Sequence, residues 1–86
     1  MLLGKHIKMA RILVNMSQTE LGKLVGISDD SIGRMELSQG IARGKVSNLN
    51  KIKQIFEKKG IEFIYGTGED SIEGAGIKYF PSKANK

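Results

Sequence analysis

The sequence predicts a mainly α-helical domain of four to five short helices that ends in a C-terminal β-hairpin. Apolar residues recur at three- and four-residue spacing through most of the first 59 residues, and glycines interrupt this pattern. After Gly60 the apolar residues alternate with polar ones, which is typical of strands. A chain of 86 residues has room for one hydrophobic core. We therefore expect a single domain over residues 1–80 and a disordered tail over residues 81–86.

Two short helices are predicted first, over about residues 4–15 and 18–25. Apolar residues at helical spacing indicate the buried face of the first helix, namely Ile7, Ala10, Leu13 and Val14. Ser17 is followed three residues later by Glu20, a spacing that predicts a capping box, in which each side chain bonds the other residue's backbone N–H. Gly26 is expected to end the second helix, because glycine readily adopts the left-handed conformation that follows many helices.

Two further helices are predicted over about residues 29–37 and 46–59. Ser28 is the expected N-cap of the third helix, whose first turn carries two aspartates in the position that the helix dipole favours. The fourth helix has apolar residues at helical spacing and two lysines in its last turn, and Gly60 is expected to end it.

The predicted hairpin consists of two strands, over about residues 61–65 and 76–80. Ile64 and Phe80 are expected on the face that is turned away from the helices. A partly apolar outer face with free strand edges favours association with a second copy. We therefore expect a homodimer that forms through the hairpins.

The composition argues against several classes of protein. The chain has no cysteine, which excludes disulfides and thiolate metal sites. His6 is the only histidine and is interpreted as a surface residue, and no serine has the His and Asp partners of a nucleophile. No apolar run approaches the roughly 18 residues that cross a bilayer. We expect a cytoplasmic protein that is no enzyme and holds no cofactor or metal, and its net charge of +5 favours a polyanionic partner.

The most informative span is residues 18–37, where two short predicted helices meet at a tight turn centred on Gly26. Gly22 lacks the bulk that would block a close crossing of these helices. A small shared core is expected from Leu21, Val25, Ile27, Ile32 and Met35. This is the pattern of a helix-turn-helix, whose second helix inserts its N-terminal residues into the major groove of DNA.

The span SQTELGKLVGISDDSIGRME resembles the lambda-repressor-like (Cro/XRE-type) helix-turn-helix family in its Gln, its Glu-Leu-small triplet, its Gly-Ile-Ser turn and its apolar-Glu ending. The resemblance extends to IKMARILVNMSQ before it and to LNKIKQIFEKKGIEFIYG after it, so it covers about residues 5–66. GAGIKYF is similar to the closing strand of one subgroup. The resemblance implies a transcriptional regulator, a repressor, that binds double-stranded DNA.

The resemblance also implies roles for individual residues. The helix that starts at Asp29 would be the recognition helix, with base edges faced by Asp29, Asp30, Ser31 and Arg34. Arg34 is the best reader, because one guanidinium can bond both O6 and N7 of a guanine. Expected phosphate contacts come from Gln18, Ser28, Ser38, Gln39, Arg43, Lys45 and Asn48. Arg11 and Glu36 match two positions that form a structural ion pair in this family.

Alternatives stay open at this point. Asp29 and Asp30 stand where related proteins often carry Gln, Arg, Thr or Ser, and both could merely stabilise the first turn of the helix. The protein could also be an antitoxin that binds DNA and a protein toxin, which a neighbouring toxin gene or a tightly copurifying partner would indicate. A third alternative is a protein-interaction module that keeps the helix-turn-helix as a scaffold. Such a module would lack salt-dependent binding to DNA.

Overall fold

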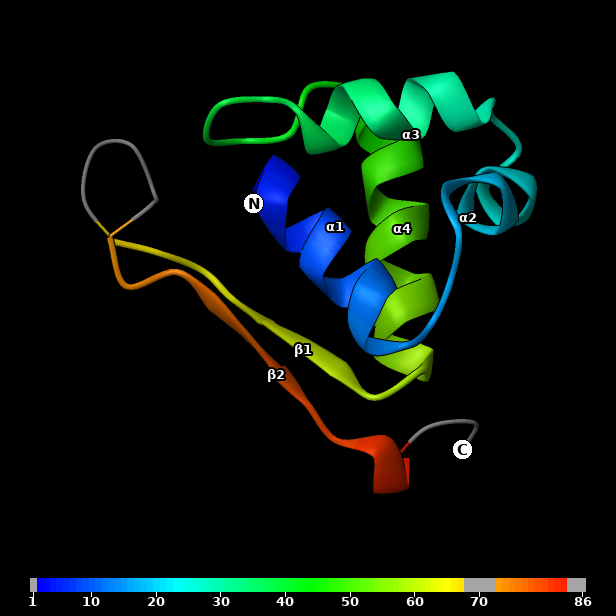
Figure 1. The fold of residues 1–86 in the computed structure, drawn as a ribbon. Coiled ribbons are helices and arrows are strands. Elements are labelled where there is room, and N and C mark those ends of the chain that lie inside the picture. The colour runs from blue at the N-terminus through cyan, green and yellow to red at the C-terminus, as the bar shows by residue number, and fades with distance from the viewer. Residues whose placement is uncertain (1, 68–72, 84–86) are drawn as a thin grey trace.

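Four helices precede a hairpin in the computed structural model, which describes residues 2–67 and 73–83 (Figure 1). The helices are α1 (Gly4–Leu13), α2 (Gln18–Val25), α3 (Asp29–Glu36) and α4 (Val46–Lys58). The strands β1 (Ile61–Ile64) and β2 (Gly76–Tyr79) pair in antiparallel fashion. The predicted mainly α fold with a C-terminal hairpin is confirmed. In Figure 1, α3 crosses the top of the molecule and the hairpin runs along its lower edge.

The ends of the helices follow local sequence signals in most places. Ser17 Oγ accepts from the Glu20 backbone N–H at 3.0 Å, and Glu20 Oε1 accepts from the Ser17 N–H at 3.1 Å, so the predicted capping box starts α2. These bonds lower the pKa of Glu20. Gly26 ends α2 in the left-handed conformation with φ of 93°. The first helix ends two residues before the predicted boundary, at Leu13, because Asn15 takes up a left-handed turn with φ of 57°.

The core lies between the helices and the inner face of the hairpin. The largest fully buried side chains come from all four helices and the segment before α1, and they are Leu3, Ile7, Leu21, Ile32, Ile52 and Phe56. Phe56 meets Phe63 edge to face at 6.2 Å between ring centroids, which joins α4 to β1. Two expectations about side chains were wrong. Leu13 is 41% exposed although it was expected in the core, and His6 is buried although it was expected at the surface.

The register of the hairpin decides which side chains face the helices. Ile61 is opposite Tyr79 and Phe63 is opposite Ile77, and all four pack against the core. The outer face has Glu62 opposite Lys78 at its centre. Pro81–Lys83 form one turn of 3-10 helix at the start of the predicted disordered tail. The rest of that tail, residues 84–86, lies outside the described residues, as do residues 68–72 between the strands.

Candidate nucleic-acid interface

α2 and α3 cross closely because Gly22 has no side chain. A Cβ atom at Gly22 would lie 2.6 Å from the Ile27 carbonyl oxygen and 3.3 Å from the backbone N of Asp29. The turn between the helices is held by the Gly22 carbonyl, which accepts from Gly26 N at 2.7 Å and from Ile27 N at 2.9 Å. The two helices therefore form a rigid corner that fixes the direction of α3.

α3 turns one face to the core and the other to solvent. Ile32, Met35 and Glu36 are buried, whereas Asp29, Asp30 and Arg34 are exposed and Ser31 is half-buried. The four residues predicted to read bases therefore share the outer part of this helix. The helix begins at Ser28, whose Oγ accepts from the Ser31 N–H at 3.1 Å and lies 3.0 Å from Ser31 Oγ. The Ser28 hydroxyl thus caps the helix, and the Ser31 hydroxyl forms a hydrogen bond with it.

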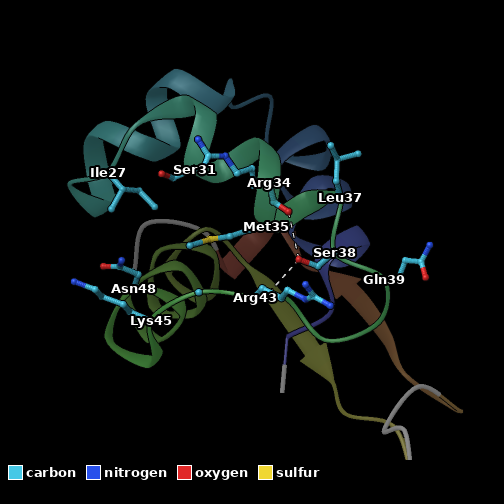
Figure 2. Close-up of a pocket in the computed structure, with 11 residues that line it drawn as sticks. Ile27, Ser31, Arg34, Met35, Leu37, Ser38, Gln39, Arg43, Lys45 and Asn48 are labelled. Atoms are coloured by element: carbon cyan, nitrogen blue, oxygen red, sulfur yellow. Dashed lines mark hydrogen bonds between the residues drawn. The ribbon is translucent and has the colours of Figure 1, made fainter.

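A groove of about 840 Å³ lies between α3, the loop after it and the start of α4 (Figure 2). Seven of the residues predicted to contact DNA line it, namely Ser31, Arg34, Ser38, Gln39, Arg43, Lys45 and Asn48. The structure therefore brings together residues that are up to seventeen positions apart in sequence. Asp29, Asp30, Gln18 and Ser28 are not among its lining residues.

The loop at the edge of this groove is held by the side chain of Ser38. Ser38 Oγ donates to the Arg34 carbonyl at 3.3 Å and accepts from the Arg43 backbone N–H at 3.1 Å (Figure 2). Arg43 and Lys45 are exposed, and Lys45 is the N-cap of α4 without a side-chain hydrogen bond to the helix. The groove therefore has two exposed cations next to a helix start that attracts anions.

The two aspartates of α3 have different partners. Asp29 Oδ1 accepts from the Asp30 backbone N–H at 2.8 Å, and Asp29 Oδ2 accepts from Thr19 Oγ1 at 3.4 Å, so Asp29 joins the start of α3 to α2. Asp30 Oδ2 lies 3.5 Å from Arg34 Nη2, one helical turn further along. Sequence reasoning treated the two carboxylates alike, because only the folded contacts distinguish them.

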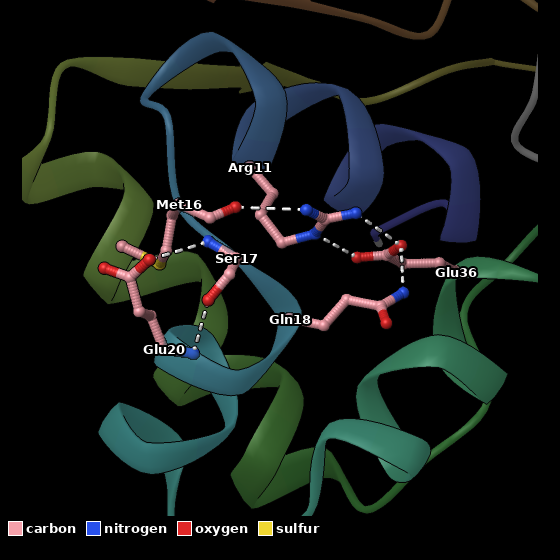
Figure 3. A network of polar contacts seen from close by, with 6 residues as sticks. All are labelled: Arg11, Met16, Ser17, Gln18, Glu20 and Glu36. Carbon is pink, nitrogen blue, oxygen red and sulfur yellow. Dashed lines mark hydrogen bonds and ion pairs between the residues drawn. The ribbon is translucent and has the colours of Figure 1, made fainter.

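A buried ion pair supports the inner side of the same helix (Figure 3). Arg11 donates to Glu36 twice, from Nε at 2.8 Å and from Nη2 at 3.1 Å, and its Nη1 donates to the Met16 carbonyl at 3.0 Å. The hydrogen bonds with Glu36 raise the pKa of Arg11 above its ordinary value, and the Glu36 side chain is only 3% exposed. The pair expected from the sequence is thus formed, and it connects α1 to the end of α3.

Gln18 belongs to this network as well as to the expected phosphate contacts. Its Nε2 donates to Glu36 Oε1 at 3.1 Å, as Figure 3 shows. An amide nitrogen carries two N–H groups, so this bond leaves one donor for another acceptor. No local sequence pattern indicates the contact with Glu36, because the two residues are eighteen positions apart.

Sequence reasoning also missed two exposed apolar residues, one that lines the groove and one that follows its lining residue Lys45 in the sequence. Leu37 lines the groove and is 83% exposed, and Val46, at the first position of α4, is 72% exposed. Neither position breaks the helical pattern, so periodicity alone does not reveal them. Separately, none of the helices in residues 2–67 and 73–83 has the length and apolar character needed to cross a membrane.

Comparison with known proteins points to the same region. Residues 7–47 match the family model described as helix-turn-helix. The match runs from the middle of α1 to the first turn of α4 and therefore includes α2, α3 and the loop that closes the groove. No curated protein matches the sequence of the chain.

Proposed function

Because residues 7–47 of this chain belong to the lambda-repressor-like helix-turn-helix family, which binds DNA, we propose that the protein is a sequence-specific transcriptional regulator. In this proposal α3 enters the major groove and the loop after it contacts the phosphate backbone. We propose that it represses transcription by occupying a promoter, and a DNA target favours a cytoplasmic location. The supporting observation is the groove, which the proposed base-reading arginine lines together with two further exposed cations.

The proposed roles follow from the exposure and chemistry of each side chain. Arg34 reads guanine through O6 and N7, which discriminates against other bases by about 1–3 kcal/mol. Arg43 and Lys45 neutralise phosphates, and the first turn of α4 offers backbone N–H groups beside them. Asn48 and Gln39 add neutral hydrogen bonds to the backbone.

The direct test is selection of binding sites from random double-stranded DNA at about 50 and 200 mM salt. We expect the wild-type protein to enrich a defined site, and Arg34→Ala to lose that enrichment. Lys58→Ala is the matched control, because it removes one exposed positive charge from the last turn of α4 without touching the groove. The logarithm of the affinity should fall by about 0.9 per neutralised phosphate for each tenfold rise in salt.

Failure of the wild-type protein to bind DNA at the lower salt concentration would contradict this function. It would favour the protein-interaction alternative, for which α1 has an exposed apolar stripe. Met9 is 47% exposed, Ile12 is 58% exposed and Leu13 is 41% exposed, and the three lie at helical spacing. A toxin or another protein partner would then be sought by copurification.

We further propose that the protein acts as a homodimer. One recognition helix reads only one half-site, and dimers of this class bind half-sites about 34 Å apart. The outer side of the hairpin, with half-buried Ile64 and Phe80, supports the surface expected from the sequence, and the stripe on α1 is a second apolar surface.

Sedimentation at tens of micromolar protein tests the dimer and separates the two surfaces. We expect a dimer for the wild-type protein and a monomer for Ile64→Lys, whereas Ile12→Lys should remain dimeric. Both variants place a charge at a hydrophobic position, so each controls for the other. A monomeric wild-type protein would contradict the dimer, and a monomer formed only by Ile12→Lys would move the interface to α1.

A further inference from the structure

The exposed face of α3 carries a carboxylate and a guanidinium that touch each other. Asp30 Oδ2 and Arg34 Nη2 are 3.5 Å apart, and the two side chains are 84% and 78% exposed. Ion pairs this exposed contribute little to folding, because water solvates both charges well. The pair lies on the solvent face of the proposed recognition helix. Its role is therefore better explained by recognition than by folding stability.

We propose that Asp30 is a positioning and specificity-determining residue that acts through Arg34. One oxygen of its carboxylate orients the Arg34 guanidinium so that the guanidinium can bond a guanine. The second oxygen accepts from the exocyclic amino group of a cytosine or adenine in the adjacent base pair. The inference rests on the proposed function, since it describes how the helix reads DNA. In this inference Asp30 and Arg34 do not read bases independently but act together as one donor-acceptor unit.

The first argument is the geometry of the guanidinium. An arginine has five N–H donors in a fixed plane, and Asp30 occupies one of them at Nη2. Enough donors remain for O6 and N7 of a guanine. An arginine side chain loses considerable rotamer freedom when it is fixed on a base, and a contact that already exists in the free protein lowers this loss.

The second argument is charge. An unpaired carboxylate in the major groove is repelled by the phosphates on both sides, which makes acidic residues unfavourable at the tip of a recognition helix. Pairing with Arg34 compensates the charge of Asp30 where the helix meets DNA. The other oxygen of Asp30 then serves as an acceptor for an amino group, the one chemical group on a base edge that a carboxylate suits.

Asp29 provides the contrast that makes the inference specific. Both of its oxygens are engaged inside the protein, one by the Asp30 N–H at 2.8 Å and the other by Thr19 at 3.4 Å. Neither contact directs the carboxylate to Arg34. Asp29 and Asp30 therefore have the same charge and neighbouring positions in the first turn, but only Asp30 is linked to the base-reading side chain.

The test compares Asp30→Asn with Asp29→Asn as its matched control. Sites are selected with the wild-type protein, and affinities are then measured for the best site, for versions changed at single base pairs, and for random DNA. We expect the wild-type protein to prefer guanine at one position by about tenfold or more, in line with one bidentate arginine contact. Asp30→Asn should reduce that preference at least about threefold, as expected when one supporting charged contact is lost. Asp30→Ala, which removes the acceptor altogether, should also lose the preference for an amino-bearing base at the adjacent position.

Both asparagine variants should bind random DNA more tightly than the wild-type protein, because each removes a negative charge near the phosphates. Only Asp30→Asn should combine this gain with lost discrimination, an outcome that a purely structural role would not produce. A double-mutant cycle with Arg34→Lys completes the test, since Asp30→Asn should have little further effect on discrimination once the bidentate group is gone. Unchanged thermal unfolding of Asp30→Asn verifies the fold.

The outcomes separate the inference from the proposed function. If the wild-type protein selects a site and Asp30→Asn keeps the full guanine preference, the inference is overturned and the regulator stands. Equal loss of discrimination in Asp29→Asn would also overturn it, because the effect would then be one of charge alone. If the wild-type protein selects no site, both the inference and the function fail.

Discussion

Gly33→Ala is expected to stabilise the free protein, because Gly33 lies in the middle of α3. Glycine is less favourable than alanine inside a helix by about 1 kcal/mol. A Cβ atom at Gly33 would have the Gln18 side chain as its nearest neighbour, with Nε2 at 3.6 Å and Oε1 at 3.9 Å. These are ordinary van der Waals distances, so no steric cost offsets the gain. Close contact with α2 is therefore not the reason for this glycine.

Gly22→Ala should instead destabilise the protein. A Cβ atom there would lie 2.6 Å from the Ile27 carbonyl oxygen, a backbone atom of the turn. The turn cannot easily move away, because the Gly22 carbonyl holds both Gly26 N and Ile27 N. Overpacking of this kind costs about 1–3 kcal/mol, against about 1 kcal/mol gained in helix propensity. We expect a net loss of about 1 kcal/mol.

Thermal and urea unfolding of the two variants beside the wild-type protein measure this pair of effects. A change of 1 kcal/mol moves Tm by about 4–8 °C in a domain of this size. Gly33→Ala should thus raise Tm by up to this amount and Gly22→Ala should lower it by a similar amount. A lower Tm for Gly33→Ala, or a higher one for Gly22→Ala, would refute the reasoning from the Cβ distances.

Three further predictions concern the inner side of α3, the start of α1 and the start of α2. Glu36→Ala should destabilise the fold by about 3 kcal/mol, because it leaves the Arg11 guanidinium largely buried without its counter-charge; a wild-type urea midpoint would contradict this. Burial, and to a lesser extent the charge of Lys5, lower the pKa of His6 from its ordinary 6.5. Neutral His6 therefore stabilises the folded state above that pH, and Tm should fall more steeply in the wild-type protein than in His6→Gln as the pH drops from about 7 to about 5. Gln18→Ala should weaken DNA binding by about 1.5 kcal/mol on every sequence and leave its salt dependence unchanged, because the lost donor is neutral; a changed slope would argue against this role.

The parts of the fold that could be predicted from sequence are those set by neighbouring residues. Ser17 and Glu20 define the start of α2 by direct mutual hydrogen bonds, and Gly26 defines its end. The end of α1 was predicted two residues too late, because a left-handed Asn15 gives a weaker signal than glycine. Leu13 was placed in the core because it follows Ala10 by three residues, but Val14, seven residues after Ile7, is the one that packs against the core.

The residues of the candidate site could be predicted from the sequence, but the shape of the groove that they line could not. Its residues follow from the family pattern, yet the groove depends on contacts between distant positions. The loop after α3 is fixed by Ser38 bonding to Arg43, by Ala42 N donating to the Leu2 carbonyl at 2.8 Å and by a bridge to the segment before α1. Such contacts leave no periodic trace in the sequence. The separation of Asp29 from Asp30 is of the same kind, because it depends on where Thr19 lies once α2 has folded.

The ion pair in the core also acts on the proposed DNA-facing surface. Arg11 fixes the carboxylate of Glu36 with two hydrogen bonds, and that carboxylate fixes the amide of Gln18 with a third. The orientation of the amide determines where its second N–H points, so a buried arginine on α1 sets the direction of a donor at the start of α2. A donor that is oriented before binding loses less conformational freedom when it meets a phosphate. The same pair would thus serve both stability and the proposed recognition, and the two roles can be separated because Glu36→Ala should affect unfolding and binding, whereas Gln18→Ala should affect mainly binding.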